Sequence, residues 1–341
     1  MRKKIFIRSL VFFIALILVA GSFVYLPYYV SKPGMAKELK PIIKVEDGYK
    51  EQGNFMLTTV RMGRANIYSY MYAKLSKYQE IYPLDEIRAE DESEEAYNVR
   101  QLYLMSSSKS NAIEVAFKKA GIPIKYDYNG VYVLNVLPDM PADGKLKPGD
   151  RIYQVDGKEF NSTEQFIQNI SKKKEGDRVK LAFDRNNKKK DITLSLKRFE
   201  DNHTKKVGVG ISLVDDKELE VSPKVSVQTD DIGGPSAGLM FSLEIYNQLT
   251  KTDYTKGYQI AGTGTISPNG TVGPIGGIEQ KIIAADKSGA EIFFAPNENG
   301  SKKSNYQDAV KTAKDIGTDM KIIPVDTFAD ALNYLKTLKA K

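Results

Sequence analysis

The chain contains no cysteine, and this absence removes several classes of chemistry at once. A cysteine nucleophile, a thiolate metal site and a disulfide framework are all excluded. His203 is the single histidine among 341 residues, so a zinc site built from several histidines is excluded as well. No G-x-x-x-x-G-K-S/T motif occurs, which argues against a phosphate-binding nucleotide site. We therefore expect no metal, nucleotide or other cofactor.

The charge balance excludes few classes of protein, because 50 basic and 43 acidic residues leave a net charge of only +7. Two lysine runs, at 172–174 and 188–190, flank polar turn residues and are predicted to be solvated loops. The alternative is that they contact an anionic lipid or a wall polymer. Nothing in the sequence indicates a nucleic-acid partner.

The amino terminus carries the clearest physical signal in the sequence. Residues 9–30 contain no charged side chain, and the run reaches the roughly 20 residues that a helix needs to span a bilayer. The basic residues that precede this run are Arg2, Lys3, Lys4 and Arg8. Their position predicts a cytoplasmic amino terminus and an extracellular remainder. We therefore predict a cytoplasmic stub and one transmembrane anchor over residues 1–30, with a signal peptide cleaved near Ala20 as the alternative.

Residues 31–120 are predicted to be a linker followed by an amino-terminal segment. Proline and lysine interrupt residues 31–48, which indicates a linker. An apolar, β-branched strand is predicted at 53–60. Apolar residues at helical spacing predict a helix over 111–120, capped by Ser110 or Asn111 and ended by Gly121.

Residues 121–200 show a different pattern, in which strands and tight turns alternate around one short helix. The helix begins after Asn161, with Ser162 or Thr163 as its cap, and a hairpin closes the unit. The segments GVYVLNVLPDMPADGKLKPGDRI (130–152) and VDGKEF (155–160) resemble a PDZ domain. That resemblance implies a mostly-β domain that binds peptides as an added strand.

PDZ domains hold a peptide carboxylate in a loop of free backbone N–H groups. The resemblance places this loop at Gly121, Ile122, Pro123 and Ile124, directly before the first strand. Pro123 removes one N–H group from the loop. The domain is therefore expected to bind either a carboxyl terminus or an internal segment, or to position the substrate only.

The segment GGPSAG (233–238) raises the question of a serine nucleophile. Ser236 is either a nucleophile or the cap of the helix that follows. An α/β-hydrolase needs a histidine after its serine, and none follows Ser236. A penicillin-binding arrangement needs S-D-N and K-T-G motifs, which are absent. A lysine base is the remaining scheme.

A lysine can accept a proton only when burial lowers its pKa enough to leave it neutral. Lys281 fits this requirement, because isoleucine and alanine residues surround it on a predicted helix after GPIGG (273–277). The alternative is a half-buried lysine whose amine extends to solvent.

Three ordered segments resemble the proteolytic domain of Lon-type proteases: GGPSAG (233–238), TGTISPNGTVGPIGG (263–277) and EQKIIAA (279–285). The resemblance covers residues 205–341, an α/β pattern, and implies a Ser–Lys dyad of Ser236 and Lys281. It also implies that Thr263 supports the lysine amine. Backbone N–H groups of Ser236 and Ala237 would then bind the oxyanion.

This sequence departs from the Lon pattern in two ways. Many Lon sequences carry an acidic residue three positions before the serine, where this chain has Gly233; Asp230 and Asp231 lie further back and receive no role. The ATPase module is also missing, so substrates are expected to be short, flexible or already unfolded.

The order of anchor, PDZ unit and peptidase resembles membrane-bound Gram-positive proteases that face the cell exterior, some of which trim secreted signalling peptides. The predicted fold is an α/β (α+β) proteolytic domain with an inserted, mostly-β PDZ domain and one transmembrane helix. The predicted function is ATP-independent serine endopeptidase activity on extracellular peptides or unfolded segments. A non-catalytic PDZ-based adaptor is the alternative. Lon-type domains often form rings, so the resemblance allows a homo-oligomer as one alternative. The sequence itself identifies no interface.

Overall fold

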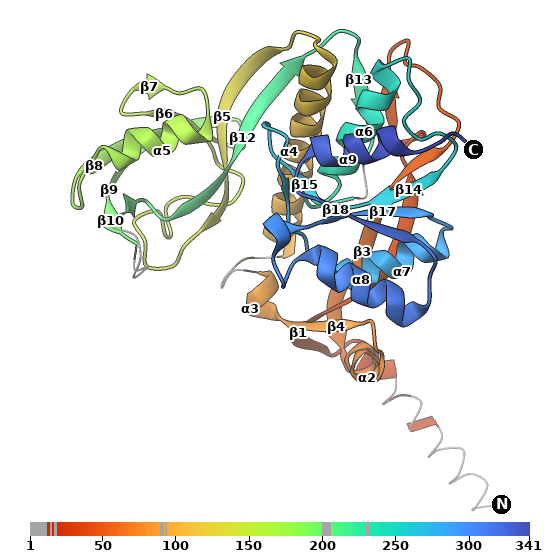
Figure 1. The fold of residues 1–341 in the computed structure, drawn as a ribbon. Helices are drawn as coiled ribbons and strands as arrows, with labels where there is room; N and C mark the ends of the chain where they lie inside the picture. The colour runs from red at the N-terminus through yellow and green to blue at the C-terminus, as the bar shows by residue number, and fades with distance from the viewer. Residues whose placement is uncertain are drawn as a thin grey trace, which may run out of the picture.

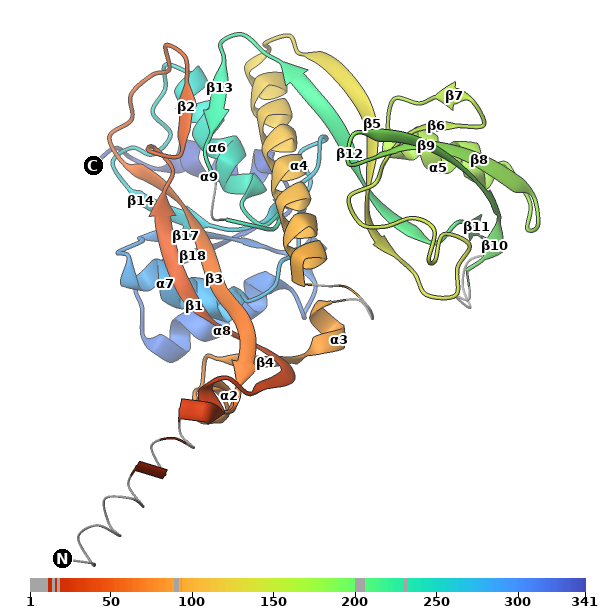
Figure 2. The same cartoon turned by 180° about the vertical axis from the view of Figure 1, so that it is seen from behind.

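The computed structural model describes residues 12, 13, 16, 19–88, 92, 94–199, 206–229 and 232–341. These residues form a larger α/β domain and a smaller β-rich domain, which lie on either side of the long helix α4 (Glu94–Ala120) (Figure 1). The view from behind shows the same arrangement (Figure 2). The larger domain has the α/β architecture expected from the sequence, and the smaller one is the expected mostly-β unit.

A six-stranded sheet forms the centre of the larger domain. Its order is β18 (Lys321–Val325), β17 (Ile292–Pro296), β14 (Gln259–Gly262), β3 (Asn54–Asn66), β1 (Tyr25–Glu38) and β4 (Glu80–Pro83). Strands β18, β17, β14 and β3 are parallel, whereas β1 is antiparallel to both β3 and β4. The predicted strand at 53–60 therefore corresponds to part of β3, which lies between β14 and β1 in this sheet. The smaller domain is an insertion into this sheet-forming sequence.

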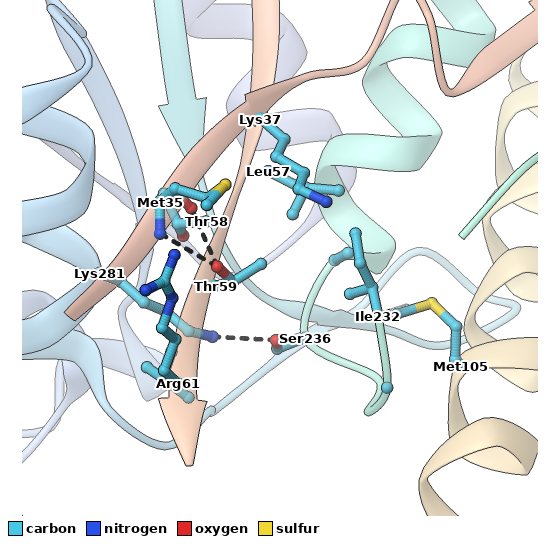
Figure 3. Close-up of a pocket in the computed structure, with 13 residues that line it drawn as sticks. Met35, Lys37, Leu57, Thr58, Thr59, Arg61, Met105, Ile232, Ser236 and Lys281 are labelled. Atoms are coloured by element: carbon cyan, nitrogen blue, oxygen red, sulfur yellow. Dashed lines mark hydrogen bonds between the residues drawn. The ribbon is translucent and has the colours of Figure 1, made fainter. Parts of the chain in front are cut away.

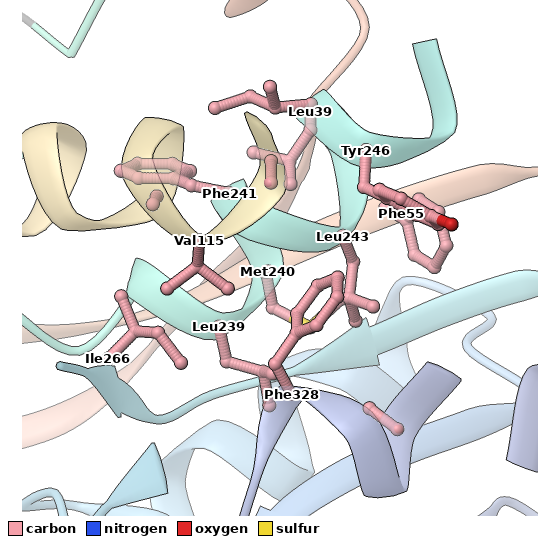
Figure 4. Close-up of a cluster of buried hydrophobic side chains, with 14 of the residues drawn as sticks. Leu39, Phe55, Val115, Leu239, Met240, Phe241, Leu243, Tyr246, Ile266 and Phe328 are labelled. Carbon is pink, nitrogen blue, oxygen red and sulfur yellow. The ribbon is translucent and has the colours of Figure 1, made fainter. Parts of the chain in front are cut away.

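Helices cover both faces of the sheet, and the alternation of side chains along β3 explains why. Phe55 and Leu57 pack into a core with α4, α6 (Gly238–Leu249) and α9 (Phe328–Thr337) (Figure 4). Met56, on the opposite side of the strand, packs into a second core with α7 (Ile278–Lys287) and α8 (Asn305–Ile316). A short hairpin of β15 (Thr265–Ile266) and β16 (Val272–Gly273) follows β14. The helix η1 (Glu298–Gly300) follows β17.

The smaller domain is built on a second sheet. Its strands run in the order β12 (Ile211–Glu220), β5 (Lys125–Val136), β6 (Arg151–Val155), β8 (Arg178–Arg185) and β9 (Lys188–Ser195). Strand β7 (Lys158–Glu159) pairs with β6, and β10 (Lys197–Arg198) pairs with β11 (Val207–Gly208). Helix α5 (Thr163–Ser171) begins at the cap Ser162, as predicted.

The predicted boundary between the domains, near residues 200–205, is wrong. Strand β12 pairs with β5 along its whole length, so the smaller domain extends to Glu220. The larger domain resumes at β13 (Val225–Val227), which pairs with β2 (Ile43–Val45). The resemblance assigns residues from 205 onward to the proteolytic domain, but sequence alone does not identify the strand with which a segment pairs.

Two predictions for residues 31–120 also need correction. Residues 31–48 are not a linker, because β1 and β2 occupy most of them and Leu39 and Ile43 are fully buried. Asn111 does not begin a helix: α4 starts at Glu94, and the side-chain Nδ2 of Asn111 donates to the carbonyl of Ile266. The end of the helix was predicted correctly, since Gly121 follows it with a φ of 72°.

The carboxyl end of the predicted transmembrane run is a strand. Tyr25–Val30 belong to β1, where Tyr29 and Val30 are buried between β3 and β4. Aromatic and β-branched residues suit this position as well as they suit a bilayer. Most of residues 1–18 lie outside the described residues. Over the part of the chain that the structure describes, no helix combines the length and the apolar character needed to cross a membrane.

A buried pair of acidic residues is formed by Glu244 of α6 and Glu51, which lies just before β3. Glu244 is fully buried, and desolvation, together with the neighbouring Glu51 carboxylate, raises its pKa well above the ordinary 4.5. Burial also raises the pKa of Glu51. Folding therefore retains protons at this pair that the unfolded chain would release.

We expect Glu244→Gln to stabilise the protein at alkaline pH. The raised pKa means that the wild-type pair stabilises the fold fully below about pH 4.5 and loses this contribution as the pH rises. A neutral amide removes the loss, so the thermal midpoint of the variant should exceed that of the wild type at pH 8.5. The difference should shrink toward pH 5 in circular dichroism melts. An equal difference at both pH values would contradict the assignment.

Candidate active site

Ser236 lies in a tight turn directly before α6. The helix begins at Gly238 with Ala237 as its cap residue and no side-chain cap, so Ser236 is not the helix cap. Its carbonyl oxygen accepts hydrogen bonds from the Gly264 amide (2.9 Å) and the Thr263 hydroxyl (3.0 Å). These two bonds fix the backbone of Ser236 to the end of β14.

Helix α4 supports the same turn from the other side. The Gly234 amide donates to the carbonyl of Gln101 (3.0 Å), and the Ser108 hydroxyl donates to the carbonyl of Pro235 (3.1 Å). A Cβ atom at Gly238 would lie 2.8 Å from the Ser108 hydroxyl oxygen, so only glycine allows this close approach. No sequence pattern predicts this support, because it depends on contacts between residues that are more than 100 positions apart.

Lys281 reaches the turn from α7, on the opposite face of the sheet. Its Nζ atom lies 2.9 Å from Ser236 Oγ (Figure 3). The same atom lies 3.0 Å from Thr263 Oγ1. Helix α7 starts after Gly277, which has a φ of 69° and approaches β3 so closely that a Cβ atom would lie 2.7 Å from Val60 Cγ1. The positive φ and the missing side chain of Gly277 therefore allow α7 to pack against β3, which places the Lys281 amine beside Ser236.

The amine of Lys281 is held inside the protein. The side chain is 2% exposed, which contradicts the alternative of an amine extended to solvent. Burial lowers its pKa to about 7. Its hydrogen-bond partners are hydroxyl groups, and it forms no ion pair with any described carboxylate. Near neutral pH a substantial fraction of this lysine is therefore uncharged and able to accept a proton.

A cavity of about 260 Å³ opens beside the two side chains. Its walls come from β1, β3, α4 and the segment before Ser236, and include Met35, Met105 and Ile232 (Figure 3). Met35 sits where the pairing of β1 and β3 shifts, and its backbone amide and carbonyl both bind the Thr59 hydroxyl. The cavity therefore lies directly beside the Ser236 hydroxyl and the Lys281 amine.

The backbone around Ser236 also supplies donors. The amides of Ser236 and Ala237 donate to none of the described residues. They are thus available to a negative oxygen near the start of α6, where the helix dipole favours such charge. Asp230 and Asp231 lie outside the described residues. Among the residues that are described, no group of acidic and histidine side chains could hold a metal ion.

The smaller domain carries a second groove of about 540 Å³, between α5 and the strands β11 and β12. Phe166, Ile167 and Ile170 line it from the helix. Strand β12 is the edge of its sheet, so its outer side is open to another strand. The amides of Val209 and Gly210, at one end of the groove, donate to none of the described residues.

The predicted carboxylate loop at Gly121–Ile124 is wrong. Gly121 is the end of α4, the Ile122 amide donates to the carbonyl of Phe117, and Ile122 and Ile124 pack against the core of the larger domain. The loop that faces α5 is instead formed by residues 207–211. Its sequence, VGVGI, contains two glycines between apolar residues directly before a strand, and this pattern could have identified it.

Comparison with known families agrees with both domains. Residues 115–196 match the family of PDZ domains. Residues 192–337 match the Lon protease (S16) C-terminal proteolytic domain. The chain therefore contains a PDZ domain and a serine-protease domain of the Lon type.

Individual relatives cover parts of the chain. It is 36% identical over 155 residues to the Lon protease of Campylobacter concisus, which covers 45% of this chain and 18% of that protein. Identity to the Lon protease of Metamycoplasma arthritidis is 32% over 119 residues, or 35% and 13% of the two chains. The chain thus spans less than a fifth of the length of these relatives. A PDZ domain of an SdrC-like protein from Listeria monocytogenes is 38% identical and covers 26% of this chain and 93% of that chain, with a TM-score of 0.25.

Proposed function

We propose that this protein is a membrane-anchored, ATP-independent serine endopeptidase that cleaves peptides or unfolded segments outside the cell. The observation that carries the proposal is the 2.9 Å separation between Lys281 Nζ and Ser236 Oγ, with the lysine buried. A nucleophile and its base must lie within hydrogen-bond reach, and the base must be able to lose its proton.

In the proposed reaction, Ser236 Oγ attacks the scissile carbonyl carbon while neutral Lys281 accepts the hydroxyl proton. The amides of Ser236 and Ala237 bind the oxyanion, and Lys281 then protonates the leaving amine. Water then enters, gives a proton to Lys281 and attacks the acyl-serine ester, and Lys281 returns this proton to Ser236 Oγ as the C–O bond breaks and the acid product leaves. Thr263 acts as a positioning residue, because its hydroxyl holds both the lysine amine and the Ser236 carbonyl.

The PDZ domain is proposed to recruit substrate through the groove between α5 and β12. An extended peptide would add to the open edge of β12, with apolar side chains against Phe166 and Ile170. The free amides of Val209 and Gly210 would hold a terminal carboxylate. This arrangement favours peptides with an accessible carboxyl terminus.

The proposed location depends on the amino-terminal sequence. The apolar run from Ser9, preceded by basic residues, favours a single-pass anchor with a cytoplasmic amino terminus. The lack of a phosphate-binding motif leaves no means of ATP-driven unfolding within this chain. Substrates would therefore be secreted peptides or already unfolded segments, including signalling peptides.

Activity should depend on pH with a midpoint near 7. Protonated Lys281 cannot accept the serine proton, and its pKa is about 7. We expect kcat/KM for a fluorogenic peptide to fall about tenfold for each pH unit below this midpoint. Above it, the rate should reach a plateau. A rate that increases as the pH falls from 8 to 5 would contradict a lysine base.

Thr263→Val should lower kcat roughly 10- to 100-fold with little change in KM, because the lysine loses one of its two hydroxyl partners. Loss of an acceptor for the charged amine should also move the midpoint of the pH profile downward. A purely structural threonine would leave this midpoint unchanged. Measuring kcat/KM against pH for both proteins separates the two roles.

The test of the proposed function is a comparison of peptide termini by mass spectrometry. Secreted peptides are incubated with wild-type protein or with Ser236→Ala, both in a mild detergent. New termini that appear only with the wild type would establish cleavage and reveal its preference. Peptides that bind to the PDZ domain but remain intact with both proteins would instead favour the non-catalytic adaptor.

A further inference from the structure

Helix α2 (Ile67–Leu75) turns an apolar stripe away from the protein. Met71, Tyr72 and Leu75 follow Tyr68 at the spacing of one helical face, and they are 60%, 65% and 87% exposed. In a helix of a soluble domain such a stripe normally faces the core. Among the described side chains with large apolar surfaces, Leu75 has the greatest exposure.

The other side of the same helix is packed in the ordinary way. The Tyr70 ring lies 5.0 Å from the Tyr28 ring, and Ala73 is buried beside Val30. The Asn66 side chain caps the helix and accepts from the Ser69 amide. The inner face of α2 already packs against β1, so the exposed stripe is not needed for the hydrophobic core. The stripe is therefore available as a contact surface for a partner outside the chain.

The apolar amino-terminal run ends beside this helix. The side-chain Nδ2 of Asn66 donates to the carbonyl of Ser22 (3.2 Å), and a Cβ atom at Gly21 would lie 2.8 Å from the Tyr68 hydroxyl oxygen. Phe23 and Val24, which follow, are 74% and 49% exposed. The stripe on α2 is therefore continuous with a run whose composition suits the interior of a bilayer.

The surroundings also fit a lipid headgroup layer. The Arg64 guanidinium lies 5.7 Å from the centre of the Tyr25 ring, and the Lys74 amine lies 5.1 Å from the centre of the Tyr70 ring. Tyrosine rings with neighbouring basic side chains are typical of the membrane interface, where each group has an apolar body and a polar end. Figures 1 and 2 place α2 at the end of the larger domain that is remote from the PDZ domain.

We propose that the exposed face of α2, formed by Met71, Tyr72 and Leu75, inserts into the headgroup layer of the membrane that holds the anchor. This inference rests on the anchored part of the proposed function. It fixes the orientation of the enzyme, because β3 leads from the catalytic cavity at Val60 to α2 at Asn66. At the rise of an extended strand, that segment is about 20 Å long.

The absence of cysteine gives a direct test, since a single introduced cysteine accepts one label. Full-length Leu75→Cys and Tyr72→Cys would each carry a nitroxide in vesicles of phosphatidylcholine and phosphatidylglycerol. Tyr49→Cys is the matched control, because Tyr49 is 44% exposed and precedes β3 at the end opposite α2. Electron paramagnetic resonance measures the access of oxygen and of a water-soluble nickel complex to each label.

We expect the labels at 72 and 75 to be accessible to oxygen and protected from nickel, with the label at 49 fully accessible to nickel. Protein that floats with vesicles while the label at 75 stays open to nickel would overturn the inference and leave the anchor intact. Protein that does not float would overturn both. Protection by a second copy would overturn the inference too, and would appear as a short label-to-label distance that vanishes on dilution with unlabelled protein.

Discussion

Lys281→Met should abolish peptide cleavage and, in the same protein, raise the stability of the fold. Activity is lost because methionine cannot accept the Ser236 proton. Stability rises because wild-type Lys281 is 2% exposed and burial lowers its pKa from 10.5 to about 7. The charged form is therefore penalised in the folded state. The penalty is absent above pH 10.5, grows as the pH falls toward 7 and is complete below 7.

The size of this effect follows from the pKa difference. At 1.36 kcal/mol per pKa unit, the penalty near pH 7 is about 4 kcal/mol, and Lys281→Met should recover a large part of it. Thermal unfolding at pH 6.5 and pH 10 would show a large gain at the lower value and little at the higher. A variant that is less stable than the wild type at pH 6.5 would contradict the buried, pKa-shifted lysine.

Ser236→Ala should reduce kcat by at least about 10³-fold, because removal of a nucleophile leaves only the contributions of substrate binding and the oxyanion site. The protein should remain folded, since the backbone carbonyl of Ser236, and not its side chain, makes the bonds to Thr263 and Gly264. Initial rates with a fluorogenic peptide would measure the loss.

Ser106→Ala is a matched control for this variant. Ser106 also precedes a lysine by three positions, but it lies exposed on α4. Its substitution should leave the rate unchanged. Comparable losses in the two variants would mean that the effect at Ser236 is not nucleophilic.

Local motifs were enough to predict the candidate dyad. Ser236 lies in the turn just before α6, and Lys281 lies in the first turn of α7. Glycines that allow unusual backbone angles or close approach precede both residues. Such short-range requirements are visible in the sequence. The distance between the two side chains was expected only from the Lon resemblance, since α6 and α7 lie on opposite faces of the sheet.

Features that depend on long-range pairing could not be predicted in the same way. The α/β pattern assigned to residues 205–341 does not reveal how the segment 211–220 pairs, and β12 pairs with β5, about 80 residues earlier. That error displaced both the domain boundary and the proposed carboxylate loop. The start of α4 was missed because the apolar periodicity along this helix is weak. Its Gln101 carbonyl accepts a hydrogen bond from the Gly234 amide in the turn before Ser236, a long-range contact.

The pairing of β5 with β12 also determines how the PDZ domain is attached. Lys125 and Glu220, where the chain enters and leaves the domain, are direct partners across this strand pair. Neighbouring strands lie roughly 5 Å apart, so a short turn could join these two positions. The PDZ domain therefore enters and leaves the chain at adjacent positions, and none of its described strands belongs to the sheet of the larger domain.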